Sequence, residues 1–153
     1  MITGKFVTDE ERLALAGKLR MEIFQDRPMT EVFPHPKARY ALLWVDGNPA
    51  GMGGVLVEDD RFMVIELGIL EEYRMQGYGD FLLRVMATPA FDDRMKKIYA
   101  DVSEDGEAFF LATHFVPDGE AYAYLGRKRI PMALDLDDLR CACSKGKFNP
   151  YRP

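Results

Sequence analysis

A glycine-punctuated segment from Ile65 to Met86 carries the clearest ligand-binding pattern in the chain. It predicts a buried strand, a short loop and an amphipathic helix, with Arg74, Gly77 and Gly79 at the junction. A strand that enters a helix through glycines leaves several backbone N–H groups without partners at the helix start. These amides and the positive end of the helix dipole suit a phosphate. The segment therefore predicts a pocket for a phosphorylated cofactor; the alternative is a tight turn that holds no ligand.

The length and composition indicate one globular domain over residues 1–153. The chain has 153 residues, 48% of them hydrophobic and 29% charged, which is enough to bury a substantial core. The formal net charge is −5, which argues against nucleic acid or an anionic membrane as the main partner. The polar stretch 139–153 is expected to be a loosely held tail.

The N-terminus predicts no targeting segment, and no apolar run approaches the length of a membrane span. We therefore expect a cytoplasmic protein. The two cysteines, Cys141 and Cys143, cannot complete a four-ligand zinc site, because His35 and His114 lie far away in the sequence. We expect ordinary reduced thiols and no bound metal.

The first helix is predicted to begin at Thr8. The run 8–11, Thr-Asp-Glu-Glu, has the spacing of a capping box in which Glu11 reaches back to the cap. One apolar face follows, formed by residues four positions apart: Leu15, Leu19 and Ile23. Three prolines then predict a loop over residues 26–37.

The remaining segments predict strands and two further helices. The strand candidates are Tyr40–Val45, Ala50–Val57, Phe62–Leu70, Lys97–Val102, Ala121–Leu125 and Arg129–Leu136. A cluster of glycines in the second of these (Gly51, Gly53 and Gly54) predicts a bulge or the close approach of another backbone. One helix is expected from Gly77 until Pro89 and the charged run 92–94 break it, and another from a Ser103 cap to Phe115. The order predicts a mixed α/β domain with hairpins on one side and a strand–helix–strand crossover in the middle.

The junction segment resembles the acetyl-CoA-binding segment of the GCN5-related N-acetyltransferase (GNAT) superfamily. The family pattern is Arg or Gln, two residues, Gly, one residue, then Gly or Ala, directly after a Leu-x-Val strand. The chain matches it without a gap from Leu67 to Gly79, and the order of elements matches over most of the chain. The resemblance implies an acyl-CoA N-acyltransferase fold with a central mixed, mostly antiparallel sheet flanked by helices.

The resemblance also implies roles for individual residues. Leu67, Gly68 and Ile69 would offer backbone groups to the pantetheine amides of acetyl-CoA, as an added β-strand does. Arg74 would lie beside the phosphates. The pyrophosphate would be held by the backbone amides of the loop and helix start: Met75, Gln76, Gly77, Tyr78, Gly79 and Asp80.

Members of this family transfer acetyl to a primary amine by direct attack, so a proton must leave the amine. Glu66 precedes Leu67, where many relatives carry an acidic residue, and we expect it to be the base, acting through water. The alternative is a strand glutamate with no catalytic part.

The family's usual general acid is a tyrosine, and here the chain departs from the pattern. One alignment places Phe110 at that position and another places Thr113 there. Tyr122, Tyr124 or solvent are the alternatives for protonating the CoA thiolate. The missing tyrosine also keeps open a second interpretation, in which the chain is a non-catalytic acyl-CoA sensor or interaction module.

The sequence does not define the acceptor beyond a small-molecule or peptide amine. Its pocket is expected between the first helix, the 26–37 loop and the final hairpin. These segments carry four acidic side chains that suit a cationic amine: Glu22, Asp26, Glu31 and Glu120. The alternative is a solvated acidic face. Homodimers are common in this fold, and a homodimer is an open alternative here.

Overall fold

The computed structural model describes residues 1–25 and 33–139, and the elements below belong to these ranges. In chain order they are β1 (Ile2–Val7), α1 (Glu10–Ile23), β2 (Arg39–Val45), β3 (Asn48–Glu58), β4 (Arg61–Ile69), the 3-10 turn η1 (Glu71–Tyr73), α2 (Tyr78–Asp92), β5 (Lys97–Ser103), the 3-10 turn η2 (Glu104–Gly106), α3 (Glu107–Ala112), β6 (Val116–Pro117), β7 (Tyr122–Tyr124) and β8 (Arg127–Asp135). The predicted tail 139–153 lies outside them except for Leu139, as does most of the predicted loop 26–37.

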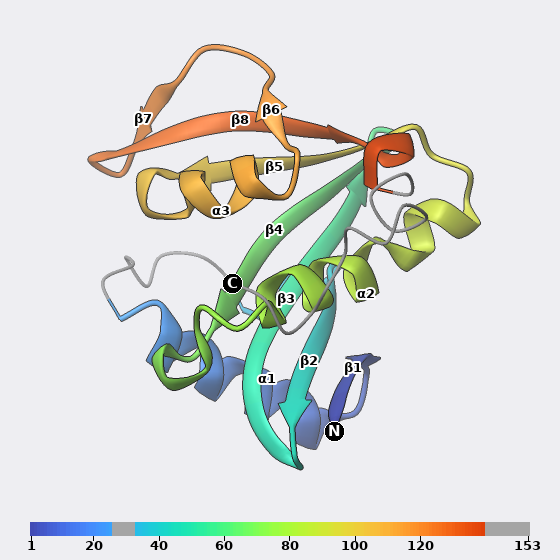
Figure 1. Cartoon of the computed structure of the whole chain (residues 1–153), viewed down its shortest axis with the longest axis vertical. Helices are drawn as coiled ribbons and strands as arrows, with labels where there is room; N and C mark the ends of the chain where they lie inside the picture. The colour runs from blue at the N-terminus through green and yellow to red at the C-terminus, as the bar shows by residue number, and fades with distance from the viewer. Residues whose placement is uncertain (26–32, 140–153) are drawn as a thin grey trace.

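The strands form one mixed sheet in the order β1-β2-β3-β4-β5-β8-β6, with β7 also paired to β8 (Figure 1). The β4–β5 pair is parallel and the other strand pairs are antiparallel. Two helical layers cover the sheet. Helix α2 packs with α3 on one face, around Leu82, Met86 and Phe110, and α1 packs on the other face through Leu19. The predicted mixed, mostly antiparallel sheet flanked by helices is confirmed.

A β-bulge in β4 changes which face its side chains occupy. Gly54 of β3 pairs with Glu66, but the next β3 residue pairs with Val64, so Ile65 is an extra residue on β4. Residues on both sides of the bulge, Val64 and Leu67, pack toward α2, whereas Glu66 contacts α1. The bulge therefore directs Ile65 and Glu66 to the same face of the sheet, on the α1 side. The glycine cluster predicted a bulge or a close backbone approach in β3. Strand β3 has its own bulge against β2, where Ala50 is the extra residue between Pro49 and Gly51, and a Cβ atom at Gly51 would lie 2.8 Å from the Gly68 carbonyl oxygen.

The parallel pair β4–β5 is short, and the two strands diverge beyond it. Pairing covers Phe62–Val64 on β4 and Ile98–Ala100 on β5. After Val64, no described residue of β4 pairs with β5, so the strand has an open edge up to Ile69. Figure 1 shows the two strands separating toward α3 on one side and η1 on the other. This opening in the sheet positions the candidate site.

Several predicted boundaries were wrong for identifiable reasons. The cap of α1 is Asp9 rather than Thr8, because an Asp9 carboxylate oxygen accepts from Arg12 N at 3.0 Å. Helix α2 continues through Pro89, since Ala90 and Phe91 beyond the proline pack against the core, and it ends at Asp92, where the predicted charged run begins.

The last elements also differ from prediction. Helix α3 ends at Ala112 because the backbone of His114 is left-handed, with φ of 78°. Strand β8 begins at Arg127, two residues earlier than predicted, since Leu125 and Gly126 both adopt positive φ and complete the turn after β7.

Gly53 is a site where a side chain would require the core around Met86 to shift. A Cβ atom there would lie 2.3 Å from Met86 Sδ and 3.1 Å from the Glu66 carbonyl oxygen. We expect Gly53→Ala to lower the free energy of unfolding by about 1–3 kcal/mol, because the core against α2 is overpacked. Chemical denaturation measures this. Gly106→Ala is the control, since its nearest contact would be an ordinary 3.5 Å; equal losses in the two variants would contradict the packing argument.

Candidate functional site

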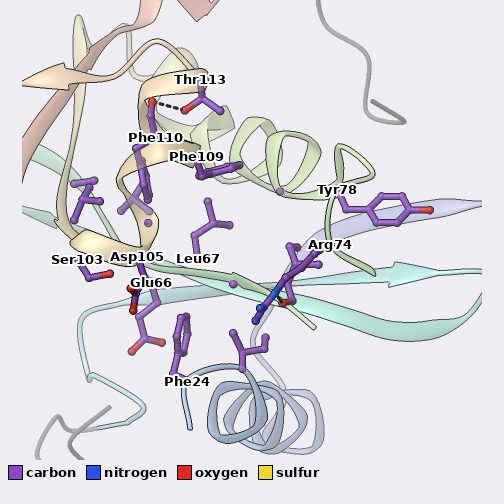
Figure 2. A pocket seen from close by; sticks show the side chains of 18 of the residues that line it. Phe24, Glu66, Leu67, Arg74, Tyr78, Ser103, Asp105, Phe109, Phe110 and Thr113 are labelled. Atoms are coloured by element: carbon purple, nitrogen blue, oxygen red, sulfur yellow. Dashed lines mark hydrogen bonds between the residues drawn. The ribbon is translucent and has the colours of Figure 1, made fainter. Parts of the chain in front are cut away.

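A cleft of about 1560 Å³ occupies the opening between β4 and β5. Its walls include Leu67 and Phe109, which pack on the α2 face, and Phe24 and Glu66, which lie on the α1 face. Figure 2 shows Glu66 and Phe24 on one side of β4, with Phe109 and Phe110 of α3 on the other. The cleft therefore runs through the sheet from one face to the other.

The loop before α2 presents a row of backbone donors. Met75 and Gly77 both have positive φ, 63° and 83°, a geometry that turns successive N–H groups toward one side. Within the described residues, no N–H from Met75 to Asp80 donates to a backbone carbonyl; Phe81 is the first to do so, to Gly77 O at 3.2 Å. The start of α2 lies at the same point. The arrangement is suited to an anion such as a pyrophosphate.

Two residues of this segment, Tyr78 and Gly79, have a packing role besides the backbone role predicted for them. Tyr78 is 9% exposed and lies edge-on to Tyr73, with ring centroids 6.3 Å apart; the residue lines the cleft, and its ring points away from Glu66 and Phe24 in Figure 2. Gly79 faces Phe109 of α3, and a Cβ atom would lie 2.8 Å from its ring. Gly79 therefore allows α3 to approach α2 closely, a role that the sequence did not reveal.

Arg74 bonds back to the strand that precedes it. Its Nε donates to the Ile69 carbonyl oxygen at 2.9 Å, and its side chain is exposed. This contact covers part of the β4 edge. Arg74 is thus close to both the strand edge and the loop donors, and its predicted place beside the phosphates stays a prediction.

The open edge of β4 exposes the polar groups of alternate residues. Leu70 N donates to Ala50 O of β3 at 2.8 Å, and in an antiparallel pair successive residues point to opposite neighbours. Leu67 and Ile69 therefore direct their N–H and C=O groups away from β3, toward the cleft, whereas Gly68 directs its groups to β3. A Cβ atom at Gly68 would lie 2.5 Å from Ile23 Cγ2, so this glycine admits the end of α1.

Glu66 forms a buried ion pair with α1. Arg20 Nε lies 2.5 Å from Glu66 Oε1, and the two residues are both 7% exposed. The guanidinium also lies over the Phe33 ring, 5.4 Å from its centroid. Glu66 is therefore held in one orientation on the cleft wall. The partner lies 46 positions away in the sequence, and no local pattern indicated it.

The sequence profile of the acetyltransferase (GNAT) family matches residues 8–110, more than half of the chain. The chain belongs to the GNAT acetyltransferase family. None of the curated proteins compared with it matches in sequence. The match ends before β6, β7 and β8, so this part of the GNAT fold is supported by structure alone.

Solved structures share the GNAT fold at low sequence identity. Escherichia coli ElaA is 20% identical with a TM-score of 0.74, over 88% of this chain and 100% of that one. An acyl-CoA N-acyltransferase from Pseudomonas aeruginosa is 20% identical with a TM-score of 0.71, over 88% and 98%. The ribosomal-protein-S18-alanine N-acetyltransferase of E. coli is 17% identical with a TM-score of 0.72, over 88% and 94%. Family and fold support an acyltransferase in general.

Neither of the two residues predicted at the family's tyrosine position, Phe110 or Thr113, supplies a phenol. Phe110 is in the core, and Thr113 is 7% exposed with its hydroxyl donating to Phe110 O at 2.9 Å. Tyr122 donates to Asp101 and lies outside the cleft lining, whereas Tyr124 and Ser103 line it. Burial and the Asp101 contact raise the pKa of Tyr122 to about 12, which weakens it as an acid.

Of the other polar residues considered in the sequence analysis, only some line the cleft. Glu22 and His114 line the cleft, and Glu120 is exposed away from it. Asp26, Glu31, Cys141 and Cys143 lie outside the described residues. In the described ranges, no group of three or more His, Cys, Asp or Glu residues could hold a metal, and no helix is both long and apolar enough to span a bilayer.

Asp80 is a carboxylate at the donor-rich start of α2. Burial raises its pKa, although the Arg84 guanidinium at 3.5 Å and His114 act in the opposite direction. The folded state therefore penalises the ionised form, and this penalty is absent at low pH and complete once pH exceeds the raised pKa.

We expect Asp80→Asn to raise the melting temperature at pH 7, because the variant avoids that penalty. The gain should shrink as pH falls toward the unfolded-state pKa of about 4, where Asp80 is also neutral. Thermal melts over this pH range measure it. A gain that does not vary with pH would contradict the electrostatic explanation.

Proposed function

We propose that the chain is an N-acetyltransferase that moves an acetyl group from acetyl-CoA to a primary amine by direct attack. The observation that carries this proposal is the cleft that passes through the sheet with Glu66 on its wall. A cofactor entering from the α2 face and an acceptor entering from the α1 face would meet in the opening between β4 and β5. Such a meeting suits a reaction in which both substrates are bound together.

Acetyl-CoA fits the groups along the α2 side of this cleft. The outward-directed backbone groups of Leu67 and Ile69 suit the pantetheine amides, which would extend the sheet as an added strand. The amides of Met75 to Asp80 suit the pyrophosphate. For pantetheine to reach the Ile69 carbonyl, Arg74 must leave it, and its guanidinium then becomes available to the nearby phosphates.

The proposed chemistry uses Glu66 as the base. The acceptor ammonium loses a proton to the Glu66 carboxylate through a water molecule, and the resulting amine attacks the thioester carbonyl carbon. A C–N bond forms, the tetrahedral intermediate collapses, and the C–S bond breaks to release the CoA thiolate. The attacking nitrogen loses its second proton to solvent and the thiolate takes up one proton, so the products are the N-acetylated amine and free CoA. Arg20 holds the Glu66 carboxylate on the cleft wall during these steps.

We expect Glu66→Gln to lower kcat by about 100-fold or more, the range of a lost general base, and to leave acetyl-CoA affinity unchanged. A thiol-release assay and calorimetric titration with acetyl-CoA measure the two quantities. Both are run well below the melting temperature, because breaking a buried ion pair costs about 3–5 kcal/mol. Unchanged turnover across the pH range would remove Glu66 from the mechanism.

Arg20→Lys is the matched control for orientation. It keeps the positive charge but replaces the guanidinium Nε that contacts Glu66. We expect a smaller fall in kcat than in Glu66→Gln, with the pH profile still governed by a carboxylate. A loss equal to that of Glu66→Gln with no change in melting temperature would instead give Arg20 a direct part in the reaction.

Of the two tyrosines considered as the proton donor, Tyr124 lines the cleft and Tyr122 does not. We expect Tyr124→Phe to lower kcat by about tenfold, less than a typical general acid, because solvent also protonates a thiolate with a pKa near 8.5. Tyr122→Phe serves as the control, because Tyr122 does not line the cleft and its hydroxyl donates to Asp101. Full activity of Tyr124→Phe would leave solvent as the proton donor.

The second candidate is a non-catalytic acyl-CoA sensor or interaction module. It is favoured by the buried Phe110 and Thr113 at the usual tyrosine position. A thiol-release assay with acetyl-CoA and a panel of amines separates the two functions. Acetyl-CoA binding without turnover on any amine would support the sensor and contradict the enzyme.

A further inference from the structure

Two arginines line the acceptor side of the cleft. Arg127 and Arg129 begin β8, and the next residue, Ile130, packs into the core on the α2–α3 face. Side chains alternate along a strand, so both arginines point to the opposite face, on which Glu66 also lies. Both residues line the same cleft as Glu66.

Arg129 is held in place by the surrounding strands. Its Nη1 donates to the Asp101 carbonyl oxygen at 3.3 Å, and its guanidinium lies 5.7 Å from the centre of the Tyr124 ring. Ser103, the last residue of β5, is its partner across the β5–β8 ladder. An arginine whose side chain is already ordered loses less conformational entropy when it binds an anion.

On the acceptor side of the cleft, the two lining arginines lie on one wall, and the opposite wall carries carboxylates. On the α1 and β4 wall the carboxylates are Glu22 and Glu66, of which Glu66 pairs with Arg20. On the β5 and β8 wall the two arginines lie with Asp101 and Asp105. Asp101 accepts a hydrogen bond from Tyr122, so one of its carboxylate oxygens is engaged by a neighbour in the protein.

We infer that the acceptor amine carries an anionic group, a carboxylate or a phosphate, which Arg127 and Arg129 bind while the amine faces Glu66. This inference rests on the proposed acetyltransferase function. The planar guanidinium matches both anions through paired N–H donors. It adds an anionic group to the expected cationic amine; of the two predicted acidic residues that the structure describes, Glu22 lines the cleft and Glu120 does not.

The test compares acceptors that differ only in the anionic group. Free α-amino acids are compared with their amides, and phosphoethanolamine with ethanolamine, in the thiol-release assay at saturating acetyl-CoA. We expect kcat/KM to be at least about tenfold higher for one of the anionic series, which corresponds to about one well-placed charged contact. The series that is preferred distinguishes carboxylate from phosphate.

The variants are Arg127→Gln, Arg129→Gln and the double variant. We expect the preference for the anionic acceptor to fall in each through a higher KM for the amine, while the KM for acetyl-CoA is unchanged. Lys128→Gln is the matched control, because it removes the same charge from the same strand but on the opposite face. Arg129→Lys should retain part of the preference, which separates binding from a folding defect.

The outcomes separate the two proposals. Equal kcat/KM for anionic and neutral amines, or an equal effect of Lys128→Gln, would overturn the anionic-acceptor inference and leave the acetyltransferase intact. Acetyl-CoA binding without turnover on any amine would overturn the acetyltransferase, and the inference with it.

Discussion

The bulge in β4 is the constraint on which the site depends. One extra residue, Ile65, changes the alternation of the strand, so that Glu66 points to α1 while Leu67 still packs toward α2. The pairing of β4 with β5 ends at Val64, next to the bulge. A regular strand paired along its whole length with β5 would bury the backbone groups of Leu67 and Ile69 in the ladder and close the cleft.

The two faces of the sheet contribute different kinds of groups to the site. The α2 face supplies backbone donors and an open strand edge, which in the proposed function would recognise a cofactor through groups that every residue has. The α1 face supplies side chains, Glu66 and the arginines of β8, which depend on residue type. This division explains how a fold can keep its cofactor site while its acceptors vary: changes on the α1 face need not disturb the strand edge or the start of α2.

Much of the fold and the cofactor segment could be predicted because their signals are local. Gly77 predicted the loop before the helix, and its backbone there is left-handed, a conformation that glycine adopts readily. The apolar run before the loop predicted the strand. The Arg20–Glu66 pair could not be predicted, since it joins residues 46 positions apart. The same holds for Gly79, whose missing side chain makes room for Phe109 of a later helix. The helix cap was predicted at Thr8, but Asp9 takes this role, because its carboxylate accepts the hydrogen bond from Arg12 N.

A structure with acetyl-CoA bound tests the central claim most directly. The account predicts the pyrophosphate on the amides of Met75 to Asp80 and the pantetheine along Leu67 and Ile69, with Arg74 released from the Ile69 carbonyl. It also predicts the thioester in the opening between β4 and β5, one water molecule away from Glu66. A cofactor bound elsewhere, or a thioester that the sheet separates from Glu66, would contradict it.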